Sequence, residues 1–179
     1  LVEQCQSLRT LTLNGITLDE DHCRLLGNIS KPGLEIELKV CAIEGAAADA
    51  LVEVLGRNQG PTKLENCYID YSILANGLRG NSRLKSLIQL RLFDPRDAPA
   101  GKREFLAITG ALRENKGLVH LHLQYKFGVS NEVWGTICDS LKTHPTLQVL
   151  DIERLACFHF PHALIKTQIQ VLVDMLQVN

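Results

Sequence analysis

Two histidines that alternate with leucines are the residues whose types and spacing most suggest chemistry in this sequence. His120 and His122 lie in LVHLHL, residues 118–123, where they alternate with Leu121 and Leu123. Side chains two residues apart on a strand share a face, so the two imidazoles could hold a metal ion or act as acid–base catalysts. They could also be two polar side chains on a solvent-facing strand. The elements around them decide between these interpretations.

Catalytic sequence motifs do not accompany the histidines. The chain has no G-x-S-x-G, G-x-x-x-x-G-K-[ST], H-E-x-x-H or G-x-G-x-x-G pattern, the motifs that would indicate a known catalytic or nucleotide-binding class. Its acidic residues are spread along the chain, with no pair marked out for acid–base work. The sequence therefore predicts a protein that is not an enzyme and takes no cofactor.

A short apolar pattern recurs along the whole chain. Four stretches read L-x-x-L-x-[LI]: LRTLTL (8–13), LIQLRL (87–92), LVHLHL (118–123) and LQVLDI (147–152). Two weaker copies, GLEIEL and GPTKL, end at positions 38 and 64. The final apolar positions are therefore 13, 38, 64, 92, 123 and 152, at intervals of 25, 26, 28, 31 and 29 residues. This near-constant spacing indicates one structural unit per interval.

The intervals carry apolar residues at helical spacing. Helices are expected within residues 19–29, 44–58, 102–115 and 131–144, with a last, strongly apolar one at 163–176. Breaks at 58–60, 115–117 and 144–145 separate helices from the strands that follow. A single strand and helix cannot bury an apolar face alone, so these units are predicted to stack as a strand–helix solenoid.

The complete unit resembles the leucine-rich repeat. Its pattern is L-x-x-L-x-L-x-x-[NC]-x-[LI]. Two copies match the second half of this pattern, IELKVCAI with Cys41 and Ile43, and LENCYI with Cys67 and Ile69. The long period with a full helix resembles the ribonuclease-inhibitor-like subclass. The resemblance implies an α/β solenoid with about six parallel strands on a concave side and helices on the convex side.

Six scattered cysteines bear on the compartment in which the protein works. They form no C-x-x-C pair and are Cys5, Cys23, Cys41, Cys67, Cys138 and Cys157. This usage favours free thiols in a reducing, cytoplasmic compartment over a disulfide framework. The family resemblance further implies that Cys41 and Cys67 point inward, bond the backbone of the turn after the strand, and stack on each other.

Alternation along the strands identifies the residues of the concave face. If the leucines of LVHLHL face the core, His120 and His122 face outward, and the repeat alignment puts Arg91 and Asp151 on either side of His122. Asp151 is then the only third metal ligand within reach and Arg91 would repel a cation, so a protein-binding surface is favoured over a metal site. The predicted partner-binding residues of this face are Glu35, Glu37, Lys39, Lys63, Glu65, Gln89, Arg91, Phe93, His120, His122, Gln124, Asp151 and Glu153.

A second candidate contact lies in FDPRDAPAGKRE, residues 93–104, within the longest interval. Pro95 and Pro99 are expected to keep this stretch extended and non-helical. It is either an ordinary variation in length or a rim loop that contacts a partner, because loops on a rigid scaffold often carry binding. Its candidate contact residues are Arg96, Asp97, Lys102 and Arg103.

Length and composition set the remaining limits. A length of 179 residues suits one leucine-rich-repeat domain over 1–179, and because the chain opens in mid-pattern, a fragment of a longer array is expected. With 45% hydrophobic residues and a net charge of −1, the chain is neither disordered nor a generic polyanion binder. It has no nucleic-acid-binding motif and no apolar run long enough to span a membrane.

These observations together predict a protein-binding scaffold. The partner is expected to be another protein, with no nucleic acid, membrane or metal involved, and the chain is expected to be monomeric or part of a larger chain. The family resemblance also allows two alternatives. One is a regulator of an enzyme, of the inhibitor or GTPase-activating type, and the other is the sensor part of an innate-immune receptor or effector.

Overall fold

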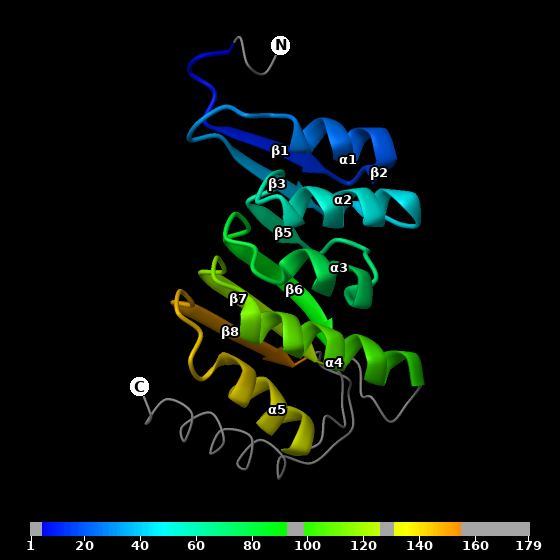
Figure 1. Cartoon of the computed structure of the whole chain (residues 1–179), viewed down its shortest axis with the longest axis vertical. Helices are drawn as coiled ribbons and strands as arrows, with labels where there is room; N and C mark the ends of the chain where they lie inside the picture. The colour runs from blue at the N-terminus through cyan, green and yellow to red at the C-terminus, as the bar shows by residue number, and fades with distance from the viewer. Residues whose placement is uncertain (1–4, 93–98, 126–130, 155–179) are drawn as a thin grey trace.

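Strands and helices alternate along the computed structural model, which describes residues 5–92, 99–125 and 131–154 (Figure 1). One parallel sheet contains, in spatial order, β1 (Thr10–Asn14), β3 (Glu35–Lys39), β5 (Lys63–Glu65), β6 (Ser86–Leu92), β7 (His120–Tyr125) and β8 (Val149–Arg154). A second, two-stranded parallel sheet contains β2 (Thr17–Leu18) and β4 (Ala42–Ile43). The helices are α1 (Glu20–Gly27), α2 (Ala46–Gly56), α3 (Tyr71–Leu78), α4 (Pro99–Glu114) and α5 (Asn131–Leu141).

Alternating side chains account for the six-stranded sheet. In β3, Ile36 and Leu38 are fully buried, while the glutamates beside them reach solvent. Parallel pairing aligns Leu13 with Leu38 and Leu38 with Leu64, so the apolar side chains form a continuous column beneath the helices. Figure 1 shows α1 to α5 stacked in chain order on one side of the strands. The prediction of an α/β chain with six parallel strands and helices on one side is confirmed.

Capping side chains start two of the helices. Asp19 accepts a hydrogen bond from the backbone N–H of His22 at 2.8 Å at the start of α1. Asp70 does the same for α3, accepting from the backbone N–H of Ser72 at 2.7 Å. The repeat predicted one helix in each interval but gave no bounds for α3, because eight residues that include Gly77 give little periodic signal.

Helix α4 begins earlier than the sequence predicted. It starts at Pro99, so the end of the stretch 93–104 is helical and not extended. Lys102 and Arg103 therefore belong to the helix expected over 102–115 and not to a rim loop. Proline is favoured at the first position of a helix, where its fixed φ fits and its missing N–H is not needed. The other two residues of the predicted rim loop, Arg96 and Asp97, lie outside the described residues, as does the predicted helix at 163–176.

Strand β6 pairs with β7 in a register that differs from the predicted one. The repeat alignment put Arg91 beside His122, whereas the structure puts Arg91 beside Gln124. The reason is a shift in the pairing between Leu87 and Leu90, where β6 holds one residue more than β7. The predicted alignment of this strand is therefore wrong.

A residue with positive φ lies at the shift. Gln89 has a φ of 62°, in the left-handed region that side chains other than glycine seldom adopt. The residues that follow β1, β3 and β5, which are Gly15, Val40 and Asn66, have φ values of 67°, 52° and 51°. The backbone N–H of Asn66 donates to the carbonyl of Ile88, which puts Gln89 next to Asn66. A residue with positive φ therefore ends each of the earlier strands, whereas in β6 the corresponding residue lies within the strand, which continues to Leu92.

Cysteines on neighbouring repeats are stacked as the family resemblance implies. The Cys41 thiol donates to the carbonyls of Leu13 and Lys39 at 3.5 and 3.4 Å. The Cys67 thiol donates to the carbonyls of Leu38 and Glu65 at 3.4 and 3.6 Å. Burial raises the pKa of Cys67 to about 11. These thiols therefore act as small donors that join one strand end to the next.

The five cysteines within the described residues are all unpaired, which agrees with the predicted free thiols. Cys23, Cys41 and Cys138 are buried, Cys67 is half-buried and Cys5 is exposed. Burial, followed by the nearby Asp19 carboxylate, raises the pKa of Cys23 to about 11. Cys157 lies outside the described residues.

Buried asparagines hold the turns that lead from helix to strand. The Asn115 side chain accepts from the backbone N–H groups of Gly117 and Leu118 at 2.9 and 2.8 Å and donates to the carbonyl of Leu78 at 2.8 Å. Asn81 makes the same pattern one repeat earlier, accepting from residues 83 and 84 and donating to the carbonyl of residue 55. Both asparagines are 1% exposed. Each side chain therefore closes its own turn and ties it to the preceding repeat.

His144 takes the place of asparagine in the next repeat. Its Nδ1 accepts from the backbone N–H groups of Thr146 and Leu147 at 3.4 and 3.2 Å. Its buried Nε2 has no hydrogen-bond partner among the described residues. Burial lowers the pKa of His144, since the charged ring would lose water without gaining an anion. At this turn a neutral imidazole thus accepts the two backbone hydrogen bonds that an asparagine side chain accepts at the earlier turns.

Candidate protein-binding surface

The face of the six-stranded sheet that points away from the helices, here called the open face, carries most of the predicted contact residues. Their side chains alternate with the buried leucines and isoleucines of each strand. β3 contributes Glu35, Glu37 and Lys39, β5 contributes Lys63 and Glu65, β7 contributes His120, His122 and Gln124, and β8 contributes Asp151 and Glu153. The alternation of side chains along the strands was sufficient to place all ten on this face, where Gln124 is buried with 6% of its surface exposed.

Ion pairs connect the open-face residues of β3 and β5. Lys39 Nζ lies 3.0 Å from Glu37 Oε2 and 3.8 Å from Glu65 Oε2, and Lys63 Nζ lies 2.9 Å from Glu65 Oε2. The hydrogen bond from Lys39, followed by the charge of Lys63, holds the pKa of the Glu37 carboxyl below its usual range. The charges alternate in sign across this part of the face.

Histidine–carboxylate pairs occupy the open face of β7 and β8. His120 Nε2 lies 2.7 Å from Asp151 Oδ2, and His122 Nε2 lies 3.2 Å from Glu153 Oε2. Gln124 Nε2 also donates to Glu153, at 2.7 Å. Each histidine reaches diagonally, because the backbone of His122 is the direct neighbour of Asp151. The side chains of His120 and His122 are 29% and 17% exposed, so they can still contact a partner.

The two histidines do not converge on one point. Each Nε2 faces a different carboxylate, so the pair does not present two nitrogens to a shared ion. Within residues 5–92, 99–125 and 131–154, no three His, Cys, Asp or Glu side chains are grouped to hold a metal. What the arrangement offers is a row of polar groups for hydrogen bonds and ion pairs.

Two predicted contact residues, both in β6, are not where the sequence placed them, and a third lies outside the described residues. Arg91 lies beside Gln124 instead of His122, and Gln89 lies beside Asn66 at the shift in β6. Phe93 lies outside the described residues. No helix in the described part of the chain is long and apolar enough to cross a membrane.

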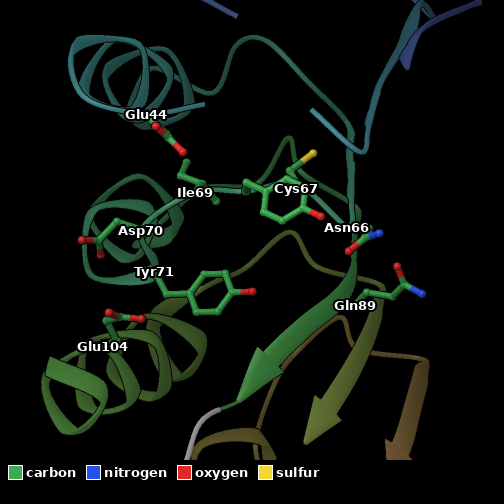
Figure 2. Close-up of a pocket in the computed structure, with 9 residues that line it drawn as sticks. Glu44, Asn66, Cys67, Ile69, Asp70, Tyr71, Gln89 and Glu104 are labelled. Carbon is green, nitrogen blue, oxygen red and sulfur yellow. The ribbon is translucent and has the colours of Figure 1, made fainter. Parts of the chain in front are cut away.

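Sequence reasoning missed a pocket of about 380 Å³ at the carboxyl ends of the strands. Its lining includes Glu44, Tyr68, Asp70, Tyr71, Gln89 and Glu104, which come from three successive repeats. Figure 2 shows the carboxylates of Glu44, Asp70 and Glu104 following one another along one side, with Asn66 and Gln89 on the opposite side. The stretch YIDY, residues 68–71, was the sequence signal that could have indicated the pocket, because it places two tyrosines and an aspartate in a loop after a strand. Loops that follow parallel strands meet at one edge of a sheet, where ligands often bind.

The architecture and the open face define an α/β protein with a leucine-rich-repeat-like fold. The solved structure of Leiomodin-1 Actin-Binding Site 2 (ABS2) is similar to it, with a TM-score of 0.57 over 87% of this chain and 86% of that one. The two sequences are 19% identical, so the likeness concerns the fold. No protein-family model matches the chain. No curated protein matches it either.

Proposed function

We propose that the chain is a non-catalytic scaffold that binds another protein through the open face. The observation that carries the proposal is the polar character of that face. Parallel sheets are usually covered on both sides by helices and are apolar on both. Here one side holds paired glutamates, lysines and histidines, with no helix of the described residues over it. Repeat proteins use such uncovered surfaces to bind partners.

Actin is the first partner to test. The similar solved structure is an actin-binding site of leiomodin-1, and that domain shares the fold of this chain. The proposal includes a curved leucine-rich-repeat solenoid of the ribonuclease-inhibitor-like subclass, in which the open face is the concave one. The helix that accompanies nearly every strand of the six-stranded sheet supports this subclass.

Binding through the open face should be weakened by removal of its two histidines. In His120→Ala/His122→Ala, the carboxylates of Asp151 and Glu153 lose their partners, and a protein seated on the face loses two contacts. We expect affinity for filamentous actin, measured by co-sedimentation, to fall about tenfold, since truncation of a central contact costs roughly 1 kcal/mol or more. The free energy of unfolding should change by about 1 kcal/mol or less, because both pairs are partly exposed.

The matched control replaces two ion-paired residues on the helical side. Arg24 and Arg57 pair with glutamates one helical turn away on α1 and α2. Arg24→Ala/Arg57→Ala should leave binding unchanged. Equal loss in both double variants would rule out the open face as the site. Absence of binding by the unmodified chain would remove actin as the partner, and a pull-down with the same three proteins would then identify another.

We also propose that the protein works in the cytoplasm. The supporting observation is that the described cysteines are unpaired and mostly buried, which suits a reducing compartment. Thiol labelling of the native chain should reach Cys5 readily and the buried cysteines slowly. All six thiols should react after unfolding without reductant, and a smaller number would contradict the proposal.

A further inference from the structure

The pocket at the carboxyl ends of the strands combines negative charge with aromatic surface. It lies where the turn after β4, the turn after β5 and the start of α4 meet, next to the edge of the open face. Its volume of about 380 Å³ is enough for one long side chain from another molecule. Among the described residues, those that line it include three carboxylates and no lysine, arginine or histidine.

The carboxylates are only partly engaged by the protein itself. Asp70 Oδ1 accepts from Ser72, as the cap of α3. The side chains of Glu44 and Glu104 form no hydrogen bond or ion pair with any described residue. Burial, followed by repulsion from Asp70, raises the pKa of Glu104 even though Arg103 acts in the opposite direction. The pocket therefore has an excess of negative charge that a bound cation would neutralise.

Two tyrosines give the pocket its aromatic surface. Tyr68 is 52% exposed, and Tyr71 is half-buried. In Figure 2 the Tyr71 ring points from α3 into the space between Asp70 and Gln89. A guanidinium group stacks on aromatic rings through its flat faces and donates to carboxylates through its edges. An ammonium group has no flat face to stack, and an anion would be repelled.

We propose that this pocket binds the side chain of an arginine that the partner protein presents. The inference rests on the proposed function, because the arginine belongs to the protein bound at the neighbouring open face. The carboxylates of Glu44 and Glu104 would receive the N–H groups, and Tyr68 and Tyr71 would cover the planar faces. The pocket would then fix the orientation of the partner relative to the sheet.

Short capped peptides test the pocket without the partner. The probes are acetyl-Gly-Arg-Gly-amide, the same peptide with citrulline, and the same peptide with lysine. Citrulline keeps the shape of arginine but has no charge. Titrated into the intact chain and followed by amide chemical shifts, the arginine peptide should shift residues 66–71 and 104. It should bind about tenfold more tightly than the citrulline peptide, because its hydrogen bonds to the carboxylates are charge-assisted.

Charge-neutral variants locate the binding. Glu44→Gln/Glu104→Gln keeps the shape of the pocket and should weaken the arginine peptide about tenfold. Glu20→Gln/Glu53→Gln removes the same charge from the outer surfaces of α1 and α2 and should leave the affinity unchanged. Tyr68→Leu should weaken the arginine peptide several-fold, since the stacked surface is lost.

Three results would overturn the inference. They are equal binding of the arginine and citrulline peptides, equal binding of the lysine peptide, and no difference between the two double glutamine variants. His120→Ala/His122→Ala should bind the arginine peptide normally. Failure of the pocket is therefore distinguishable from failure of the open face, which the co-sedimentation experiment measures separately.

Discussion

Gly117→Ala is expected to lower the free energy of unfolding by about 3 kcal/mol, because the added methyl group has no space. A Cβ at this position would lie 2.5 Å from Ser82 Cα, 2.6 Å from its carbonyl carbon and 2.8 Å from its oxygen. All three are backbone atoms of the preceding repeat, so no side-chain rotation can relieve the contact. Urea denaturation followed by circular dichroism measures the change.

Gly135→Ala is the matched control for Gly117→Ala. Gly135 lies inside α5, and a Cβ there would meet nothing within 4 Å. Alanine is a better helix former than glycine, so we expect stabilisation of about 0.5–1 kcal/mol. If both variants changed stability by the same amount, the close approach between residues 117 and 82 would not be a feature of the folded chain.

Asn115→Ala should destabilise the chain by about 3 kcal/mol, through loss of hydrogen bonds at the same turn. Two backbone N–H groups, of Gly117 and Leu118, and the carbonyl of Leu78 would lose their partner in a buried environment. A buried polar group without a partner costs about 1–3 kcal/mol. Asn76→Ala, at an exposed position of α3, should be neutral or slightly stabilising in the same urea experiment. Similar losses in the two variants would contradict the role assigned to Asn115.

His144→Asn replaces the histidine of the last described turn with the residue found at the earlier turns, and it should change how stability depends on pH. Because burial lowers the pKa of His144, the unfolded chain binds a proton at this residue more readily than the folded one. The stabilisation by the neutral ring is complete above the unfolded pKa of about 6.5 and is lost as the pH falls through the lower folded pKa. The variant should lose this part of the acid sensitivity while keeping stability at pH 8. An unchanged pH profile would mean that His144 is not the titrating group.

The sequence was sufficient to predict the repeat and the open face, because both depend on the alternation of apolar and polar residues along the strands. Leucines at every second position have to be buried, so His120 and His122 have to be on the other side. The inward place of Cys41 and Cys67 came from the family resemblance, and the thiol–carbonyl distances agree with it.

The register of β6 could not be predicted from the same pattern. Its stretch LKSLIQLRL, residues 84–92, offers apolar residues at intervals of three, one, two and two, and several alignments bury equally many of them. The structure adopts one of them by giving Gln89 a positive φ, a conformation that a glycine would have indicated and a glutamine does not. The pocket was hidden for a different reason. Its walls come from loops of three repeats, and the stretch YIDY, residues 68–71, belongs to only one of them.

The three-residue length of β5 has a mechanical consequence. β5 is joined to β3 and to β6 through three residue pairs each, whereas β7 and β8 share six. β5 is therefore the described strand of this sheet with the fewest paired residues, and we expect a force that pulled the two ends of the array apart to separate the strands there first. Residues 66–71, which follow β5 directly, form one wall of the pocket. Tension on the chain would therefore distort the pocket before it disturbed β7 and β8.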